Sequence, residues 1–187
     1  MTFKKKTLVG SPVRHNNSVY KVIEVTELHE DEWTRLRDLR LSSLLESPHA
    51  YGGKYEDEKL YTETQWRLGF KKLSFLVASL NGVDVGLMSV ENLQGDFEST
   101  CWIGGCWTDP KFRGTGLMRA IFNYLDAHAD ENNWKVQGLG VWTDNFEAIK
   151  AYGFLGFIAM GQPQPNSRQP GKFYQIMIRE MTLIPQL

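Results

Sequence analysis

The segment 106–119 holds the residues best suited to binding an anion. A predicted strand ends there at an Asp-Pro pair, a Gly-X-Gly turn follows at Gly114 and Gly116, and a helix is predicted to begin at once. The first N–H groups of a helix lack intrahelical acceptors and, with the helix dipole, attract negative charge. Glycine lets the backbone approach phosphate oxygens without a Cβ in the way. Because Arg113 and Arg119 add positive charge, the segment predicts a pyrophosphate-binding loop.

A Gly-X-Gly turn alone has a simpler interpretation, since such short motifs occur by chance in tight turns. The segment lacks the third glycine of a Rossmann fingerprint and the Gly-Lys-Ser/Thr of a Walker A loop. On its own, therefore, the turn leaves open both a phosphate site and a purely structural role.

The elements that must position this segment follow from periodicity. A hairpin is the clearest, because Asn81-Gly82 between two apolar runs favours a type I′ turn. Apolar residues spaced by three and four predict helices, and runs rich in β-branched residues predict strands. The predicted helices span 30–46, 64–70, 117–133 and 145–152, the last ended by Gly153 and Gly156, and the predicted strands span 20–25, 75–80, 83–90, 100–108, 136–143, 157–160 and 173–179. Together they predict a mixed α/β sheet.

Length and composition favour one domain over 20–187, preceded by a flexible tail at 1–19. With 21 Lys and Arg against 22 Asp and Glu, the net charge of −1 gives no reason to expect nucleic acid or an anionic membrane as a partner. No apolar run approaches the roughly 20 residues of a membrane span, and no signal peptide is evident, so a cytoplasmic protein is expected.

The cysteines and histidines point away from metal and redox chemistry. Cys101 and Cys106 lie about 16 Å apart if the predicted strand is regular, too far for a disulfide, so both are expected to be reduced. The four histidines are scattered without metal-ligand spacing, and no metal is expected.

A family resemblance rests on two blocks of sequence. The run 110–116, Pro-Lys-Phe-Arg-Gly-Thr-Gly, resembles the Gln/Arg-x-x-Gly-x-Gly/Ala motif of the GNAT superfamily of N-acetyltransferases. The run 139–157 resembles that family's next block, with Asn145, Ala148, Tyr152 and Gly156-Phe157 at the expected spacing. The two matches in this order are more specific than either alone. The resemblance implies a predominantly antiparallel sheet of about six to seven strands, flanked by helices and splayed at the coenzyme site.

It also implies roles for individual residues, with acetyl-CoA as co-substrate. The backbone of Cys106, Trp107 and Thr108 would pair with the pantetheine arm, and an N–H near Trp107 could stabilise an oxyanion. Asn145 would contact the coenzyme, and Tyr152 would protonate the departing thiolate; the alternative for Tyr152 is a packed aromatic. The pyrophosphate would be held after Arg113 by the backbone amides of Gly114, Thr115, Gly116, Leu117, Met118 and Arg119.

Two positions depart from the family pattern. Met118 stands where Gly or Ala is usual, which crowds the helix start. Gly140 stands where some members carry a catalytic Glu, so Glu91 is the substitute candidate for a general base. Alternatively, Glu91 is an exposed charge at a strand end and a water chain deprotonates the amine.

The acceptor is the least defined partner. The resemblance assigns it to the first helices, their loop and the later loops. The acidic loop with Glu56, Asp57 and Glu58, together with aromatic residues between His49 and Trp66, could attract a cationic amine or simply be solvated. A small-molecule or peptide amine is expected, and a homodimer is left open. Three functions compete at this stage: an amine acetyltransferase, a domain that senses acyl-CoA without catalysis, and an interaction protein with a structural glycine turn.

Overall fold

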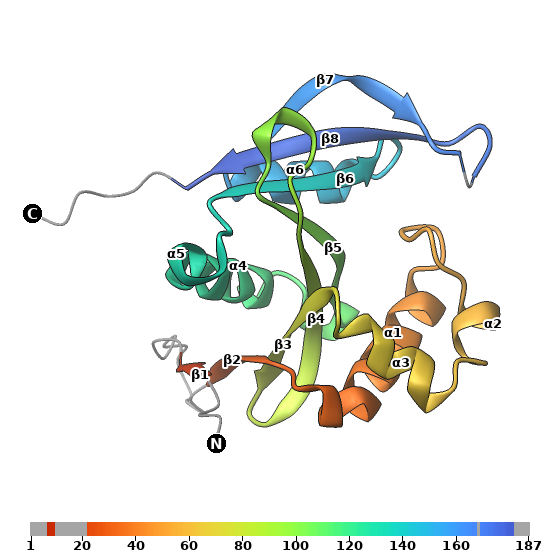
Figure 1. Ribbon diagram of the computed structural model, residues 1–187, viewed down its shortest axis with the longest axis vertical. Helices are drawn as coiled ribbons and strands as arrows, with labels where there is room; N and C mark the ends of the chain where they lie inside the picture. The colour runs from red at the N-terminus through yellow and green to blue at the C-terminus, as the bar shows by residue number, and fades with distance from the viewer. Residues whose placement is uncertain (1–6, 10–21, 168, 182–187) are drawn as a thin grey trace, which may run out of the picture. The chain divides into compact units, whose positions relative to one another are not determined.

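The computed structural model describes residues 7–9, 22–167 and 169–181 (Figure 1). Its strands are β1 (Thr7–Val9), β2 (Ile23–Glu27), β3 (Leu73–Leu80), β4 (Val83–Asn92), β5 (Cys101–Thr108), β6 (Val136–Trp142), β7 (Ile158–Pro165) and β8 (Phe173–Glu180). The α-helices are α1 (Trp33–Glu46), α2 (Tyr55–Glu58), α3 (Glu63–Gly69), α4 (Leu117–Ala127), α5 (Ala129–Asn132) and α6 (Phe146–Phe154). Short 3-10 turns are η1 (Glu30–Glu32), η2 (Asp96–Glu98) and η3 (Pro110–Phe112). The predicted mixed α/β class is confirmed.

The described residues form two compact units. The first unit contains the described residues up to Val90 together with Gly105–Tyr124, and the second contains Glu91–Gly104 and the described residues from Leu125 onward. Each unit has its own buried apolar residues, among them Leu36 in the first and Leu139 in the second.

In the first unit the strands follow one another in the order β1, β2, β3, β4. β2 is antiparallel to both β1 and β3. Part of the stretch predicted as a tail is therefore a strand, and the rest of 1–19 lies outside the described residues. The hairpin turn between β3 and β4 is confirmed, since Asn81 and Gly82 have φ values of 51° and 79°.

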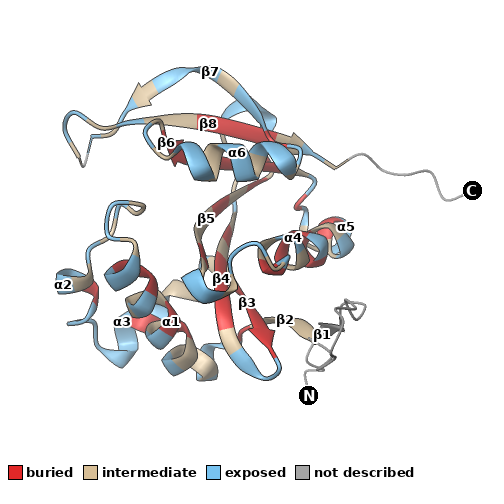
Figure 2. Cartoon of the chain, turned by 180° about the vertical axis from the view of Figure 1, so that it is seen from behind, coloured by how far each residue is buried: buried red, intermediate tan, exposed pale blue. Residues whose placement is uncertain are grey.

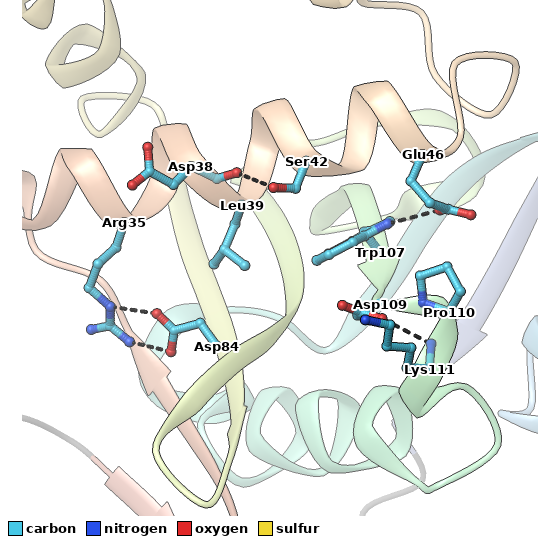
Figure 3. A pocket seen from close by; sticks show the side chains of 10 residues that line it. All are labelled: Arg35, Asp38, Leu39, Ser42, Glu46, Asp84, Trp107, Asp109, Pro110 and Lys111. Atoms are coloured by element: carbon cyan, nitrogen blue, oxygen red, sulfur yellow. Dashed lines mark hydrogen bonds and ion pairs between the residues drawn. The ribbon is translucent and has the colours of Figure 1, made fainter.

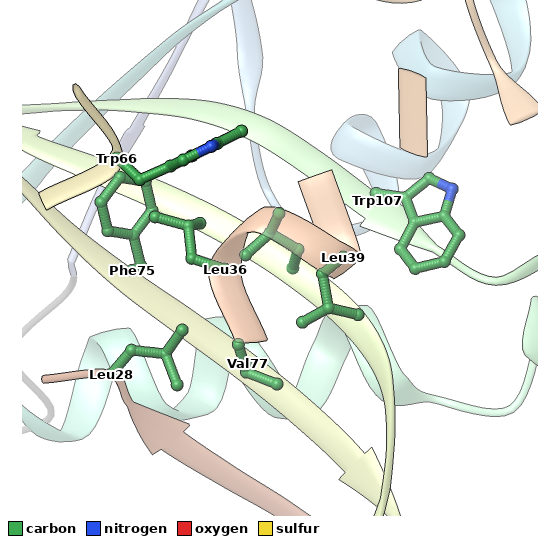
Figure 4. Packing of buried hydrophobic residues seen from close by; sticks show 8 residues of the cluster. Leu28, Leu36, Leu39, Trp66, Phe75, Val77 and Trp107 are labelled. Carbon is green, nitrogen blue, oxygen red and sulfur yellow. The ribbon is translucent and has the colours of Figure 1, made fainter. Parts of the chain in front are cut away.

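Helices α1 and α3 pack on this part of the sheet through one apolar cluster (Figure 4). Leu36 and Leu39 of α1 meet Trp66 of α3, Phe75 of β3 and Trp107 of β5, all at most 8% exposed. The middle residues of β3 and β4 are buried (Figure 2). This packing fixes α1 beside the end of β5, where the predicted coenzyme segment begins.

A largely buried ion pair fastens α2 to α1. Arg40 donates to both carboxylate oxygens of Glu58, at 2.8 Å from Nε and 2.6 Å from Nη2, and the two side chains are 18% and 12% exposed. A Cβ on Gly53 would lie 2.0 Å from Glu58 Oε1. Any other residue at position 53 would therefore displace the Glu58 carboxylate.

Replacing Arg40 by methionine is expected to destabilise the protein by about 3–5 kcal/mol, because it leaves the buried Glu58 carboxylate without a partner. Urea unfolding followed by circular dichroism measures the change. The double variant Arg40→Met, Glu58→Leu should recover most of the loss, since no buried charge then remains. Equal stability of Arg40→Met and the native protein would contradict a buried pair.

The second unit contains the first residues of β5 followed by β6, β8 and β7. β6 is antiparallel to β8 along its whole length, from Val136–Glu180 to Trp142–Tyr174. The parallel ladder of β5 with β6 is short, from Cys101–Gln137 to Ile103–Leu139. The ladder ends at Ile103, five residues before β5 itself ends.

Several predicted boundaries are corrected. The first strand is shifted to Ile23–Glu27, and the helix predicted over 117–133 is broken at His128 into α4 and α5, with Asn133 left-handed at φ 58°. α6 runs through Gly153, and the chain turns only at Gly156, where φ is 93°. The strand predicted over 100–108 is present as β5, with a local irregularity at Gly105, where φ is 59°.

Candidate coenzyme-binding site

The loop 113–119 lies between η3 and α4 in the first unit and presents backbone donors. The first helical bond joins the Ala120 N–H to the Gly116 carbonyl at 2.9 Å, and the Thr115 N–H reaches the Phe112 carbonyl at 3.4 Å. No described residue outside α4 accepts a hydrogen bond from the other amides at this turn, those of Gly114, Gly116, Leu117, Met118 and Arg119. An α-helix start leaves its first N–H groups without intrahelical acceptors. These donors are the chemical basis of an anion site.

The two glycines give this loop its shape and its open surface. Gly114 and Gly116 have φ values of 74° and 92°, a region that other L-residues enter only with strain. A Cβ built on either glycine would meet no atom within 4 Å. The space above both residues is therefore open, and the glycines are required by backbone conformation and leave room for a ligand.

Arg113 is held at the base of the loop by α1 and β5. Its Nη2 lies 2.6 Å from Glu46 Oε2, and its Nε donates to the Thr108 carbonyl at 3.2 Å. The same Glu46 oxygen accepts from the Trp107 indole at 3.1 Å (Figure 3). Burial raises the pKa of Glu46, but hydrogen bonds from Ser47 and Trp107 and the charge of Arg113 outweigh it and lower that pKa overall. Glu46 thus stays ionised and ties the end of α1 to the loop.

The backbone of 106–108, predicted to pair with the pantetheine arm, already has partners at two carbonyls. Tyr51 donates its hydroxyl to the Cys106 carbonyl at 3.1 Å, and Arg113 occupies the Thr108 carbonyl. Burial raises the pKa of Tyr51, so its hydroxyl remains a donor at neutral pH. A pantetheine amide would have to share these oxygens, which have a second lone pair, or use backbone N–H groups instead.

A cavity of about 540 Å³ lies next to this network. One side of α1 forms a wall, and Trp107, Asp109 and Lys111 form the opposite one (Figure 3). Arg35, the other cation of the lining, is occupied by Asp84, at 2.8 Å from each of two guanidinium nitrogens. Because Asp38 and Glu46 also face this space, its walls are better suited to a neutral or cationic group than to a phosphate.

Two further predicted site residues lie at α6 in the second unit. Asn145 is the N-cap of α6, and its Oδ1 accepts the Ala148 N–H at 3.2 Å. Tyr152 lies two turns later, half-buried, with its ring centroid 5.8 Å from that of Phe157 in an edge-on arrangement. Capping engages one end of the Asn145 amide, and ring packing orients Tyr152.

Glu91 and Gly140 also lie in this unit. Glu91 is half-buried near the end of β4. A Cβ on Gly140 would lie 3.1 Å from the Tyr174 ring and 3.6 Å from the ring of Trp102. The space that an acidic side chain would need at position 140 is thus taken by aromatic rings, which gives a packing reason for the departure from the family pattern.

The residues present fit a CoA-type ligand. Its diphosphate requires several unpaired donors in an open, glycine-lined turn, and the loop 113–119 provides them. Within the described chain no three His, Cys, Asp or Glu side chains gather as metal ligands, and both cysteines are free thiols. No helix in the described ranges is long and apolar enough to cross a bilayer.

Comparisons with known proteins agree with this geometry. The profile of the Acetyltransferase (GNAT) family matches residues 25–157. The chain belongs to the GNAT acetyltransferase family. Members of this family use acetyl-CoA, so the coenzyme and the N-acetyltransferase type of chemistry follow from membership. No curated protein matches the sequence.

Solved GNAT structures share the fold at low identity. A GNAT acetyltransferase from Streptococcus pneumoniae superposes with a TM-score of 0.68 at 17% identity, over 86% of this chain and 99% of that one. The yncA protein of Salmonella typhimurium, whose structure contains its cofactor acetyl-CoA, superposes with a TM-score of 0.62 at 18% identity. The match covers 86% of this chain and 94% of that one. The ribosomal-protein-S18-alanine N-acetyltransferase of Escherichia coli superposes with a TM-score of 0.61 at 14% identity, over 88% of this chain and 97% of that one. At these identities the likeness shows the fold alone.

Sequence reasoning missed the residues that hold the loop from outside it. Glu46 and Tyr51 contact Arg113 and Cys106 across 67 and 55 positions of sequence, and neither belongs to a motif. The only sequence signal for Glu46 is its place at the end of a predicted helix, just before Ser47-Pro48.

Proposed function

We propose that this GNAT protein transfers the acetyl group of acetyl-CoA to a primary amine by direct attack. The observation that carries the proposal is the loop 113–119, with its open glycines and backbone donors that no described residue occupies. Every helix start leaves its first N–H groups without intrahelical acceptors, but here the two glycines also keep the space above those donors open to a ligand. A cytoplasmic protein remains our prediction for its location.

The chain's own residues supply binding, orientation and proton transfer. The amides of Gly114 through Arg119 would hold the diphosphate, and Arg113, fixed by Glu46, would add positive charge beside it. Backbone groups of Cys106–Thr108 would align the pantetheine arm, and a β5 N–H near Trp107 would face the negative charge that develops on the acetyl oxygen. Asn145 would add a side-chain contact.

Tyr152 would act as general acid. The thioester supplies an activated acetyl group: the amine nitrogen forms the new C–N bond, the C–S bond breaks, and Tyr152 would give its proton to the departing sulfur. The amine must lose one proton, for which Glu91 or a water chain is the candidate. No residue of the chain needs to become acylated in this scheme.

The test combines coenzyme binding with turnover. Millimolar CoA is expected to raise the melting temperature, because a ligand selective for the folded state stabilises it. A panel of amines with acetyl-CoA, monitored by release of free thiol, should then give turnover with at least one acceptor. CoA stabilisation with no turnover across the panel would favour the alternative, an acyl-CoA-sensing domain. No stabilisation at all would point to a structural turn.

A further inference from the structure

The second unit contains a buried polar network that the proposed mechanism does not use. Arg179 of β8, whose side chain is 13% exposed, donates to the Asp126 carboxylate and to Gln137 Oε1, the latter at 3.1 Å from Nε and 2.7 Å from Nη2. Gln137 is fully buried, and its amide nitrogen donates to Asp126 at 3.1 Å and to the Trp134 carbonyl at 3.2 Å. The carboxylate and the amide therefore hold the guanidinium plane in one orientation.

The rest of the Arg179 side chain lies against the turn that follows α6. Its Nη1 donates to the Leu155 carbonyl at 3.1 Å, and its guanidinium carbon lies over the Phe157 ring, 5.4 Å from the centroid. The side chain also passes close to Gly156, where an added Cβ would lie 3.5 Å from Arg179 Cδ. One arginine thus lies along all three residues of the turn 155–157.

This turn is connected to Tyr152 in two ways. The Tyr152 carbonyl accepts the N–H groups of both Leu155 and Phe157, each at 3.0 Å. The Phe157 ring, which is only 4% exposed, packs edge-on against the Tyr152 ring with 5.8 Å between the centroids. Arg179 and Tyr152 therefore contact the same phenylalanine ring, and the position of that ring limits the orientations open to the phenol.

The helix that carries Tyr152 has few anchors of its own. None of the nine residues of α6, all of which the structure describes, is buried (Figure 2). Phe157, three residues beyond the end of the helix, is the first buried side chain after it. The contacts of Arg179 with the turn 155–157 are therefore a main constraint on the end of α6 at which Tyr152 lies.

Stability alone does not explain a charge at this place. Burial lowers the pKa of Arg179 more than the neighbouring Asp126 carboxylate raises it, so the charged form is opposed by its surroundings. A buried ion pair is often no more stabilising than apolar side chains of similar size. An apolar residue at position 179 would also cover Phe157, but it would not fix the Leu155 carbonyl in one orientation, as the planar guanidinium does. What the network adds is geometry.

We propose that Arg179 is a positioning residue for Tyr152: by fixing the turn 155–157, it holds the phenol in the orientation that protonates the departing thiolate. The proposal rests on the proposed function, because Arg179 has no such role if Tyr152 is not the general acid. Arg179 needs no contact with coenzyme or acceptor in this scheme, and the acetyl-transfer step itself is unchanged.

Arg179→Lys tests the assignment, because lysine keeps a positive charge beside Asp126 but lacks the planar fork that also reaches Gln137 and Leu155. With acetyl-CoA and the most active amine of the panel, kcat from thiol release is expected to fall about 10–100-fold, since a displacement of about 1 Å costs this much. The ring NMR signals of Tyr152, assigned by their absence in Tyr152→Phe, should shift. Stabilisation by CoA should stay unchanged.

A double-mutant cycle shows whether Arg179 acts through the phenol. In the Tyr152→Phe background, Arg179→Lys should change kcat by less than about twofold, because no proton donor remains to be positioned. Ile176→Val is the control for lost stability. It removes one buried methyl group of β8 and should lower the melting temperature while kcat stays within about a factor of two.

If Arg179→Lys fails to fold, Phe157→Leu takes its place. It keeps an apolar side chain and removes the ring that both Arg179 and Tyr152 contact, so the same losses are expected.

The outcomes separate this proposal from the one beneath it. No turnover of any panel amine, or equal kcat for the native protein and Tyr152→Phe, overturns both. Where Tyr152→Phe is impaired, an unchanged kcat or unshifted Tyr152 ring signals in Arg179→Lys, or losses that multiply in the double variant, overturn the role of Arg179 alone.

Discussion

Replacing Tyr152 by phenylalanine is expected to lower kcat by about 10²–10⁴-fold while leaving CoA binding nearly unchanged. The physical reason is that a positioned proton donor for a leaving group contributes about this much to the rate. The ring packs edge-on against Phe157, and phenylalanine preserves that contact. Steady-state kinetics by thiol release gives kcat, and thermal stabilisation by CoA gives binding.

Tyr174→Phe is the matched control for this variant. Tyr174 also lies in the second unit, and its hydroxyl donates to Gln164 Oε1 at 3.1 Å. Removing that hydroxyl should cost about 1 kcal/mol of stability and leave kcat within a factor of two. Equal kcat for Tyr152→Phe and Tyr174→Phe would remove Tyr152 from the mechanism and assign it to packing.

Gly116→Ala is expected to weaken CoA binding about 10–100-fold. The methyl group would enter the open space above the turn, and displacement of the diphosphate would cost one charge-assisted hydrogen bond at about 1.5–3 kcal/mol. Since φ is 92° at this residue, alanine should also destabilise the free protein by about 1–2 kcal/mol. Calorimetric titration with CoA and urea unfolding measure the two effects separately.

Gly171→Ala separates backbone strain from loss of the ligand. Gly171 has φ 86°, and a Cβ there would likewise meet nothing within 4 Å, but it lies in the turn between β7 and β8. The two variants should lose similar stability, and only Gly116→Ala should lose CoA affinity. Equal CoA affinities in both would show that the open space at Gly116 is not a binding surface.

Local patterns in the sequence predicted the parts of this fold that local chemistry determines. Asn81-Gly82 predicted the hairpin because few other dipeptides accept two positive φ values. The glycine turn at 114–116 predicted a helix start with open donors for the same reason. The break at His128 was not predictable in this way, because the apolar stripe continues through it while Asn132 Nδ2 turns back to the His128 carbonyl.

The surroundings of the candidate site depend on contacts between distant segments. Nothing near Glu46 in the sequence indicates that it accepts hydrogen bonds from both Arg113 and Trp107. Likewise, the acidic residues of the loop favour a cationic acceptor when they are counted in the sequence, but Arg40, 18 positions before Glu58, neutralises that carboxylate. Charge counted along a sequence is a poor guide to a pocket, because ion pairing is decided by tertiary packing.

The central claim is that backbone amides of the loop 113–119 bind the diphosphate of CoA. An amide-resolved NMR titration of the protein with CoA tests it most directly. The largest shifts are predicted at the N–H groups of Gly114, Gly116 and Leu117, and acetyl-pantetheine, which lacks the diphosphate, should leave those signals in place. If CoA binds while the chemical shifts of these amides stay unchanged, or if both compounds change those shifts equally, the loop is not the diphosphate site.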